Sequence, residues 1–209
     1  MDSDAGQRHS PRLAVYIVAD CSGGMLRQMP IVRQCVSVIA QPPLLDPRSA
    51  ETVCISVIPF NDDAQPTPLT PPGRFMPPPL EALGKTQLGR ALQTVNAALD
   101  ADLVAPCVRP DGAHLPGDYR PLVFLVTDGV PSTPEKVEWR PQADLLRERR
   151  QHRPWRIVGL AVGPKADLDT LSAIADKTIV VTGDMAALEQ NLMEVFDWVP
   201  EPDSEGDCS

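Results

Sequence analysis

The apolar run at residues 13–19 is the feature that most constrains the fold of this chain. It reads Leu-Ala-Val-Tyr-Ile-Val-Ala, contains no charge and is rich in β-branched side chains. Such a run suits a strand that is buried on both faces, as in a parallel sheet. It stops on Asp20, and Ser22, Gly23 and Gly24 follow in a polar turn. We therefore expect a buried strand whose polar end lies at the carboxyl edge of the sheet, where open α/β sheets place their binding sites.

The rest of the chain alternates between apolar strands and amphipathic helices. Further strands are expected at residues 52–60, 121–128, 155–162 and 179–181. Helices are expected at residues 29–40, from Thr86 onward, at 141–150, around 168–174 and after Asp184. The pattern predicts a doubly wound α/β domain over residues 13–199, with a mostly parallel central sheet flanked by helices. One short antiparallel edge strand is expected in the proline-rich residues 64–79, because an edge strand tolerates proline.

The termini and one long connection stand apart from this pattern. Residues 1–12 are polar and residues 200–209 are acidic, so both are expected to be disordered segments. Residues 101–120 form a proline- and glycine-rich connection that is long for a compact domain, and long loops of this kind often carry function. Residues 132–135, Ser-Thr-Pro-Glu, have the spacing of a helix capping box.

Charge and cysteine usage limit the classes of function. A formal net charge of −9 argues against binding to nucleic acid or to an anionic membrane. No apolar run is long enough to span a bilayer and residues 1–12 carry no signal-peptide core, so we expect a cytoplasmic protein. The five cysteines are scattered and lack metal-site spacing, which favours reduced thiols, with Cys35 and Cys54 as small core residues.

Four polar side chains are expected to meet at the carboxyl edge of the sheet. Asp20 and Asp128 each end an apolar strand, Ser22 lies just past the first of these strands, and Thr86 opens a helix after a glycine. Carboxylate and hydroxyl oxygens are the ligands that Mg²⁺ prefers. A magnesium site at this edge is therefore one interpretation of the pattern.

Each of these residues also has a structural interpretation. Thr86 could cap its helix, and Asp128 with Gly129 could be a simple turn at the end of a strand. Asn61 and Asp62 could likewise be turn residues, or they could line the rim of the site together with Gly129. The combination at strand ends, rather than any one residue, favours the functional interpretation.

Three segments of the chain resemble the von Willebrand factor A (VWA) domain. They are Asp20-Cys-Ser22-Gly-Gly24, Gly84-Lys-Thr86 and Thr127-Asp128-Gly129. In that family these segments form the metal-ion-dependent adhesion site (MIDAS), and the match extends over nearly all of residues 13–199. Residues 58–61, 123–131, 138–141 and 159–163 look most like the bacterial TerY-type branch. Proteins of that branch are associated with tellurite-resistance and stress-response gene clusters, some beside a protein kinase and a phosphatase.

The resemblance implies a non-catalytic binding or adaptor module that holds Mg²⁺, or Mn²⁺, and binds an acidic residue of a protein partner. The family motif is Asp-x-Ser-x-Ser, and its last serine is a direct metal ligand. Gly24 stands at that position here and has no side chain. Water can replace one ligand of Mg²⁺, so we expect this departure to weaken metal binding rather than to abolish it. The matching metal residues are then Asp20, Ser22, Thr86 and Asp128.

Two other functions remain open from the sequence. A metal-free adaptor of the same fold would bind partners through the loops at residues 64–83 and 101–120, and Gly24 favours this version. An enzyme would use Ser22 or Cys21 as a nucleophile, or Mg²⁺ for phosphoryl transfer. None of the three histidines is expected at a strand end, and Walker A, GxSxG and GxGxxG motifs are absent, so we expect no enzyme.

Overall fold

A parallel five-stranded sheet forms the centre of the protein. The computed structural model describes residues 10–41, 52–108, 114–152 and 156–196. The strands of the sheet are β1 (Leu13–Asp20), β2 (Val53–Phe60), β5 (Leu122–Thr127), β6 (Arg156–Val162) and β7 (Lys177–Val181). They lie in the order β2-β1-β5-β6-β7, and every neighbouring pair is parallel. The predicted doubly wound α/β fold is confirmed.

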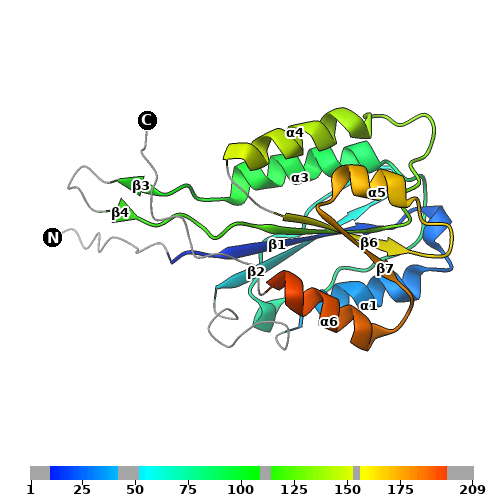
Figure 1. Ribbon diagram of the computed structural model, residues 1–209, viewed down its shortest axis with the longest axis horizontal. Coiled ribbons are helices and arrows are strands. Elements are labelled where there is room, and N and C mark those ends of the chain that lie inside the picture. The colour runs from blue at the N-terminus through cyan, green and yellow to red at the C-terminus, as the bar shows by residue number, and fades with distance from the viewer. Residues whose placement is uncertain (1–9, 42–51, 109–113, 153–155, 197–209) are drawn as a thin grey trace.

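Helices cover both faces of this sheet (Figure 1). α1 (Met29–Ile39) and α6 (Met185–Phe196) lie on one face, and α3 (Leu88–Asp102), α4 (Trp139–His152) and α5 (Leu168–Ile174) lie on the other. Two apolar cores result, one on each side of the sheet. All eight residues of β1 are buried, because the strand packs into both cores. The uninterrupted apolar run at residues 13–19 is the consequence of this central position.

The described segments differ from the expected ones in length more than in kind. α4 begins two residues before the expected residue 141 and ends two residues after residue 150. β7 begins at Lys177 rather than residue 179. The expected loop at residues 101–120 contains a small antiparallel hairpin, β3 (Cys107–Val108) with β4 (His114–Leu115). Figure 1 shows this hairpin beyond the amino ends of the central strands.

The expected antiparallel edge strand is present only as isolated bridges. Residues 64–70 run antiparallel to β2 and pair with it at Ile55–Thr70 and Phe60–Ala64. The backbone N–H of Thr67 also donates to the carbonyl of Val57 at 2.8 Å. Prolines at positions 66 and 68 lack the N–H groups that a continuous ladder requires, and this explains the interruption.

Several smaller expectations are borne out by the described residues. Cys21, Cys35 and Cys54 are free and buried. The Asp184 carboxylate accepts hydrogen bonds from the N–H groups of Ala186 and Ala187, as expected for the residue that caps α6. No helix in the described ranges is long and apolar enough to cross a membrane. Of the segments predicted to be disordered, residues 1–9 and 200–209 lie outside the described residues. The prediction was wrong for the end of the first segment, residues 1–12, because Arg12 is held by Asp118 through an ion pair at 3.1 Å.

Candidate functional site

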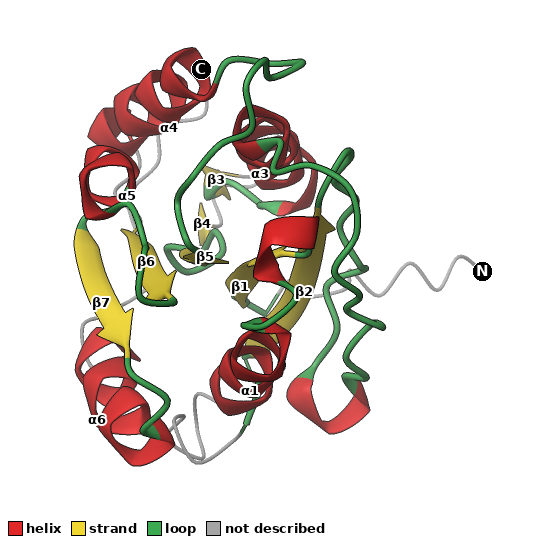
Figure 2. Cartoon of the chain, turned by 90° about the vertical axis from the view of Figure 1, so that its right-hand side faces the viewer, coloured by secondary structure: helices red, strands yellow, loops and turns green. Residues whose placement is uncertain are grey.

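The four predicted metal residues lie where the direction of winding in the sheet reverses. β1 has β2 on one side and β5 on the other, so the chain winds away from β1 in both directions. In open α/β sheets this switch point leaves a crevice at the carboxyl ends of the two central strands. Asp20 is the last residue of β1 and Asp128 follows the last residue of β5. Figure 2 looks onto this carboxyl edge, with the 3-10 turn η1 (Gly23–Met25) in front of β1 and β2.

The carboxylate of Asp20 is fixed by donors on both of its oxygens. Oδ1 accepts a hydrogen bond from the backbone N–H of Ser22 at 2.9 Å. Oδ2 accepts one from the Thr127 hydroxyl at 2.6 Å, and this hydroxyl in turn accepts from the N–H of Gly129 at 3.0 Å. The strand register explains the contact between Asp20 and Thr127, because these two residues directly follow the paired residues Ala19 and Val126. Asp20, Ser22 and Thr127 are all buried.

Burial disfavours the charged forms of both aspartates, and a neighbouring carboxylate adds to the effect at each of them. Burial raises the pKa of Asp20 to about 6, although the hydrogen bonds from Thr127 and Ser22 oppose the rise and the negative charge of Asp128 adds to it. Burial likewise raises the pKa of Asp128. A hydrogen bond from the N–H of Val130 opposes this rise, and the negative charge of Asp167 adds to it. The charge of Asp128 thus adds to the effect of burial on Asp20 at a poorly solvated edge of the sheet.

Thr86 lies at the same edge but does not cap a helix. α3 begins at Leu88 after the cap position Gln87, which makes no side-chain capping bond. Thr86 is held instead by Ser132, whose Oγ accepts from the N–H of Thr86 at 3.0 Å and whose N–H donates to its carbonyl at 2.9 Å. The loop before Thr86 is tied to the end of β1, since the N–H of Gly23 donates to the Gly84 carbonyl at 3.0 Å.

The spacing at residues 132–135 has a different use from the expected capping box. The Glu135 carboxylate accepts from the N–H of Gly89 at 3.0 Å and from the N–H of Trp139 at 3.3 Å. It therefore serves the first turns of α3 and α4 at once. A side chain at Gly89 would overlap the Val137 carbonyl, so this glycine permits the close approach of the loop. Ser132 and Glu135 together fix the segment that carries Thr86.

The predicted rim residues have unequal surroundings. Asn61 lies in a turn where its Oδ1 accepts from the N–H of Asp63 at 3.3 Å. Asp62 is exposed and packs against Gly84, whose positive φ of 73° favours glycine. Gly129 is buried beneath the Asp167 carbonyl, also with positive φ, and the exposed residue beside it is Val130. The rim is thus formed by neighbouring loops that are hydrogen-bonded to one another.

The residues present suit a hard divalent cation. The oxygen donors at the site are carboxylates and hydroxyls, which are the ligands that Mg²⁺ prefers. Among the described residues, no three or more His, Cys, Asp or Glu side chains are placed to hold a metal, so the hydroxyls are a necessary part of this site. A Cβ atom built at Gly24 would meet only the Ser22 Oγ, at 3.9 Å, so position 24 faces the site and has room for a side chain. Asp20 interacts with Ser22 by a hydrogen bond and with Asp128 through its charge, whereas the loop of Thr86 is connected to them through the backbone.

Sequence reasoning did not identify Thr127 and Ser132 as parts of this site. Thr127 holds the Asp20 carboxylate, and Ser132 holds the backbone of Thr86. Thr127 belonged to the segment Thr127-Asp128-Gly129 that carries the family resemblance, but no role was assigned to its own side chain. Ser132 carried a capping signal that indicated a helix end rather than a contact with a residue 46 positions away.

Comparison with known proteins finds similarity of structure only. None of the family models compared with the sequence matches it, and no curated protein does either. The pilus adhesin SpaC from Lactobacillus rhamnosus GG aligns over 91% of this chain with a TM-score of 0.60 and 13% identity. Proximal thread matrix protein 1 from the mussel byssus aligns over 89% with a TM-score of 0.58 and 15% identity. Manganese-loaded TRAP protein from Plasmodium vivax aligns over 87% with a TM-score of 0.52 and 14% identity.

These alignments support a VWA-like α/β fold. The chain covers 46% of the mussel protein and 30% of the SpaC chain, so it spans less than half the length of these two structures. It covers 73% of the Plasmodium protein. At such low sequence identity the likeness establishes the architecture, and the function must be argued from the site itself.

Proposed function

We propose that this chain is a non-catalytic protein-binding module of the VWA type. Asp20, Ser22, Thr86 and Asp128 would hold Mg²⁺ or Mn²⁺ at the carboxyl edge of the sheet, the aspartates acting largely through water. The metal would supply a positive charge with an open coordination position for a carboxylate. An acidic side chain of a protein partner would bind there.

One observation carries this proposal: two carboxylates lie at the carboxyl edge of the sheet, the charge of one acts on the other, and no Lys or Arg among the described residues pairs with them. Asp20 is fully buried, and the charge of Asp128 raises its pKa further. Neither forms an ion pair with any Lys or Arg in the described ranges. Burying an unpaired charge is costly, so this arrangement favours either a proton or an added cation. The adjoining hydroxyl oxygens suit a cation of the Mg²⁺ class.

The surroundings of the possible nucleophiles support a role without catalysis. Burial raises the pKa of Cys21 to about 11, which leaves the thiol protonated and unreactive. Of the histidines within the described ranges, His114 is in β4 and His152 ends α4, and both positions belong to the amino side of the sheet (Figure 1). No imidazole from those positions serves as a base for Ser22.

The cellular role is a further part of the proposal. The resemblance to the TerY-type branch supports a bacterial, cytoplasmic stress-response or signalling system, including tellurite resistance. A kinase, a phosphatase or another component of that system is the partner class that this resemblance suggests. The neighbour crystallised with manganese supports a metal-loaded form of such a fold.

A metal-free scaffold is the second candidate, and it has its own supporting observation. The proline-rich loop has an exposed Met76, and the three prolines that follow it, residues 77–79, line an open pocket of about 310 Å³ together with Arg33 and Val36 of α1. The Arg33 guanidinium holds the loop by donating to the carbonyl of Leu80. Consecutive prolines form a stiff extended segment of the kind that binding domains recognise.

Calorimetric titration of the EDTA-treated protein with Mg²⁺ and with Mn²⁺ tests the metal site. We expect heat that saturates at one site in the wild type and disappears in Asp20→Ala and Thr86→Ala. Partner capture from a bacterial lysate should then weaken in EDTA and in the same variants. Full capture in EDTA, together with loss on deletion of residues 71–79, would replace the first function with the metal-free scaffold.

A further inference from the structure

Three large aliphatic side chains are exposed around the candidate metal site. Leu26 is 68% exposed, Leu83 is 61% exposed and Val130 is 47% exposed. Each belongs to a different loop, and each loop also carries a site residue or its immediate neighbour: Leu26 follows η1, Leu83 precedes Gly84, and Val130 follows Gly129. Single exposed aliphatic residues are ordinary, but several gathered at one functional edge indicate a contact surface.

The backbone around these side chains is held in place. The N–H of Leu83 donates to the Cys21 carbonyl at 2.8 Å, and the N–H of Leu26 donates to the Gly23 carbonyl at 3.3 Å. The N–H of Val130 donates to Asp128 Oδ1 at 3.0 Å. The loops cannot withdraw these side chains into the core without breaking bonds that also organise the site. Their exposure is therefore a property of the ordered site.

Cationic side chains lie between these aliphatic residues in the sequence. Arg27 follows Leu26 directly and Lys85 lies two residues after Leu83; both are exposed, and neither has an ion-pair partner within the described ranges. Of the nearby acids, Asp63 pairs with Arg90 at 3.1 Å. The carbonyl of Asp62 accepts from the Lys136 ammonium at 2.8 Å. The exposed carboxylates of Asp62 and Glu81 also have no ion pair among the described residues, so the positive charge is local to Arg27 and Lys85. There, beside Leu26 and Leu83, it fits an acidic group of a partner that is flanked by apolar ones.

We propose that Leu26, Leu83 and Val130 form an apolar collar that binds a partner segment in which one acidic side chain lies between apolar side chains. The acidic group points to the metal site, the flanking aliphatic or aromatic groups cover the collar, and Arg27 and Lys85 favour a partner of negative charge. This rests on the proposed function, because the site beneath the collar supplies the cation for the acidic group. A metal site that contacted a lone carboxylate would discriminate poorly, and the collar adds selectivity through contact area.

Selection from a random peptide library tests the proposal with the full chain as bait in millimolar Mg²⁺. We expect enriched peptides to contain Asp or Glu with Leu, Ile, Phe or Trp beside it. A synthetic peptide of the most enriched sequence is then titrated into four proteins: the wild type, Leu26→Ser/Leu83→Ser/Val130→Ser, the control Val104→Ser/Val180→Ser/Met193→Ser, and Asp20→Ala. The control removes comparably exposed aliphatic groups from elsewhere on the molecule.

The expected result is at least tenfold weaker binding by the collar variant and less than a twofold change in the control. Arg27→Glu/Lys85→Glu should weaken binding as well, and thermal unfolding should confirm that all variants fold. Undiminished binding by the collar variant, enriched peptides without apolar neighbours, or no enrichment at all would overturn the collar. Binding that fails in the collar variant but persists in Asp20→Ala and in EDTA would keep the collar and reject the metal site. The opposite pattern would keep the metal site alone.

Discussion

Buried carboxylates have different partners at the two edges of the central sheet. At the amino edge, Asp118 is paired with Arg12, whose Nη2 lies 3.1 Å from its Oδ2. The N–H of Val104 also donates to the same oxygen at 3.0 Å. At the carboxyl edge, Asp20 is buried with only hydroxyl and amide donors, and a second carboxylate lies nearby. One edge balances its charge within the chain and the other does not.

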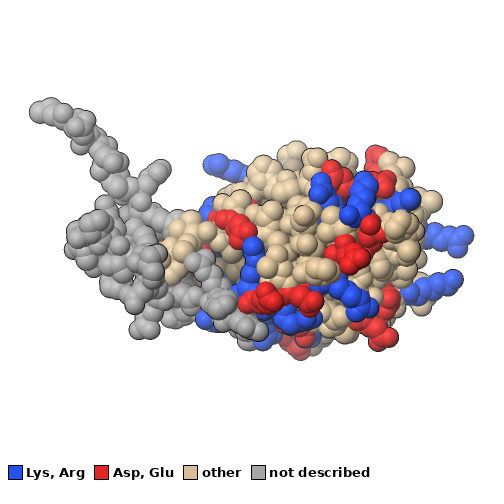
Figure 3. Space-filling view, turned by 90° about the horizontal axis from the view of Figure 1, so that it is seen from above, with Lys and Arg blue, Asp and Glu red and all other residues tan. Residues whose placement is uncertain are grey.

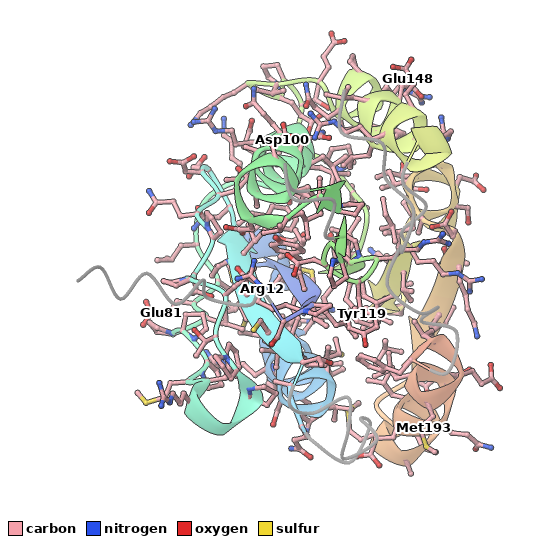
Figure 4. All side chains as sticks on the ribbon, turned by 90° about the vertical axis from the view of Figure 1, so that its left-hand side faces the viewer. Arg12, Glu81, Asp100, Tyr119, Glu148 and Met193 are labelled. Carbon is pink, nitrogen blue, oxygen red and sulfur yellow. The ribbon has the colours of Figure 1, made fainter. Side chains whose placement is uncertain are left out.

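This difference separates structural ionic contacts from functional ones. Figure 4 looks onto the amino edge, where Arg12 and Tyr119 lie near the start of β1. Arg12 also donates to the carbonyl of Asp102, whose carboxylate accepts from the Tyr16 hydroxyl at 3.0 Å. These contacts fasten the end of α3 and residues 118–119 to the sheet, and Arg12 provides the Asp118 carboxylate with a cation from the chain. The carboxyl edge is the place where an external cation would gain most.

The charged residues on the visible surface do not by themselves reveal this contrast. In the view of Figure 3, acidic and basic side chains are interspersed over the outer helices. Exposed ion pairs occur on both sides of the molecule, such as Arg147 with Asp144 on α4 and Lys177 with Glu194 of α6. Exposed pairs of this kind contribute little to stability because water and salt screen them. The informative charges are the buried ones at the two edges.

The largest expected effect is an opposite pH dependence of stability at the two edges. Burial raises the pKa of Asp20 to about 6, so the folded protein favours the protonated form of this side chain. The folded protein is therefore destabilised relative to the unfolded chain as pH rises through about 4 to 6. In metal-free buffer, Asp20→Asn should therefore gain stability relative to wild type by about 2 kcal/mol between pH 4 and pH 7. Denaturant unfolding at several pH values measures this difference.

Asp118→Asn is the matched variant at the other edge. Burial alone would raise the pKa of Asp118, but hydrogen bonds from Arg12 and Val104 lower it below its usual value. Its contribution to stability is complete above the unfolded pKa of about 4 and is lost as pH falls through the folded pKa. Asp118→Asn should therefore be less stable than wild type at neutral pH and approach it in acid. The same pH dependence in both variants would contradict the comparison.

A smaller effect is expected when the ion pair at the amino edge is broken directly. Arg12→Ala leaves the nearly buried Asp118 carboxylate without its cation and should lower the free energy of unfolding by about 1–2 kcal/mol. Because Arg12 is partly exposed, water compensates for part of the loss. Mg²⁺ binding measured by calorimetry should be unchanged. Loss of metal binding in this variant would show that the two edges are coupled.

The contact from Thr127 to Asp20 should matter more to metal binding than to folding. Thr127→Val removes the hydroxyl that orients the Asp20 carboxylate but keeps the shape of the buried side chain. Loss of such a supporting bond weakens metal binding in other proteins by about 10–100-fold, and we expect at least the lower end of that range. Titration with Mn²⁺ measures it, and Thr94→Val is a control because Thr94 lies on α3 and bonds to the Ala64 carbonyl.

The sequence sufficed to predict the fold because its strands are buried on both faces. Uninterrupted apolar runs such as residues 13–19 and 122–126 predict strands that are buried on both faces. Such strands belong to a sheet covered by helices on both sides, so the runs were enough to predict the fold class. The predicted edge strand was less accurate because prolines break the ladder in a way that no periodicity shows. The hairpin β3–β4 has strands of two residues, too short to give a pattern.

The site was predicted where chemistry follows from strand ends and was missed where it depends on loop packing. Asp20 and Asp128 were identified because parallel strands bring their carboxyl ends to one edge. The structural interpretation of Thr86 as the helix cap does not hold, because the cap position is Gln87 and Ser132, from a distant loop, satisfies the backbone of Thr86. Contacts between loops that are far apart in the chain leave no local signal, and the exposure of Leu26 and Leu83 likewise appears only in three dimensions.

The smallest expected effect is a change in metal affinity at position 24, where this chain has Gly24 in place of the last serine of the Asp-x-Ser-x-Ser motif. Gly24→Ser places a hydroxyl into open space beside Ser22 Oγ and restores the Asp-x-Ser-x-Ser spacing, so metal affinity should rise about three- to tenfold, the gain of one additional polar contact. Gly73→Ser is the matched control, because a side chain there meets nothing within 4 Å and lies in another loop. Calorimetry with Mg²⁺ compares all three proteins at one pH above 7, where Asp20 is ionised. Higher affinity in Gly24→Ser alone would show that the edge is organised around a cation and lacks one ligand. Equal affinity in the three proteins would mean that position 24 does not reach the metal, and the carboxyl edge would then need another explanation for its unpaired carboxylates.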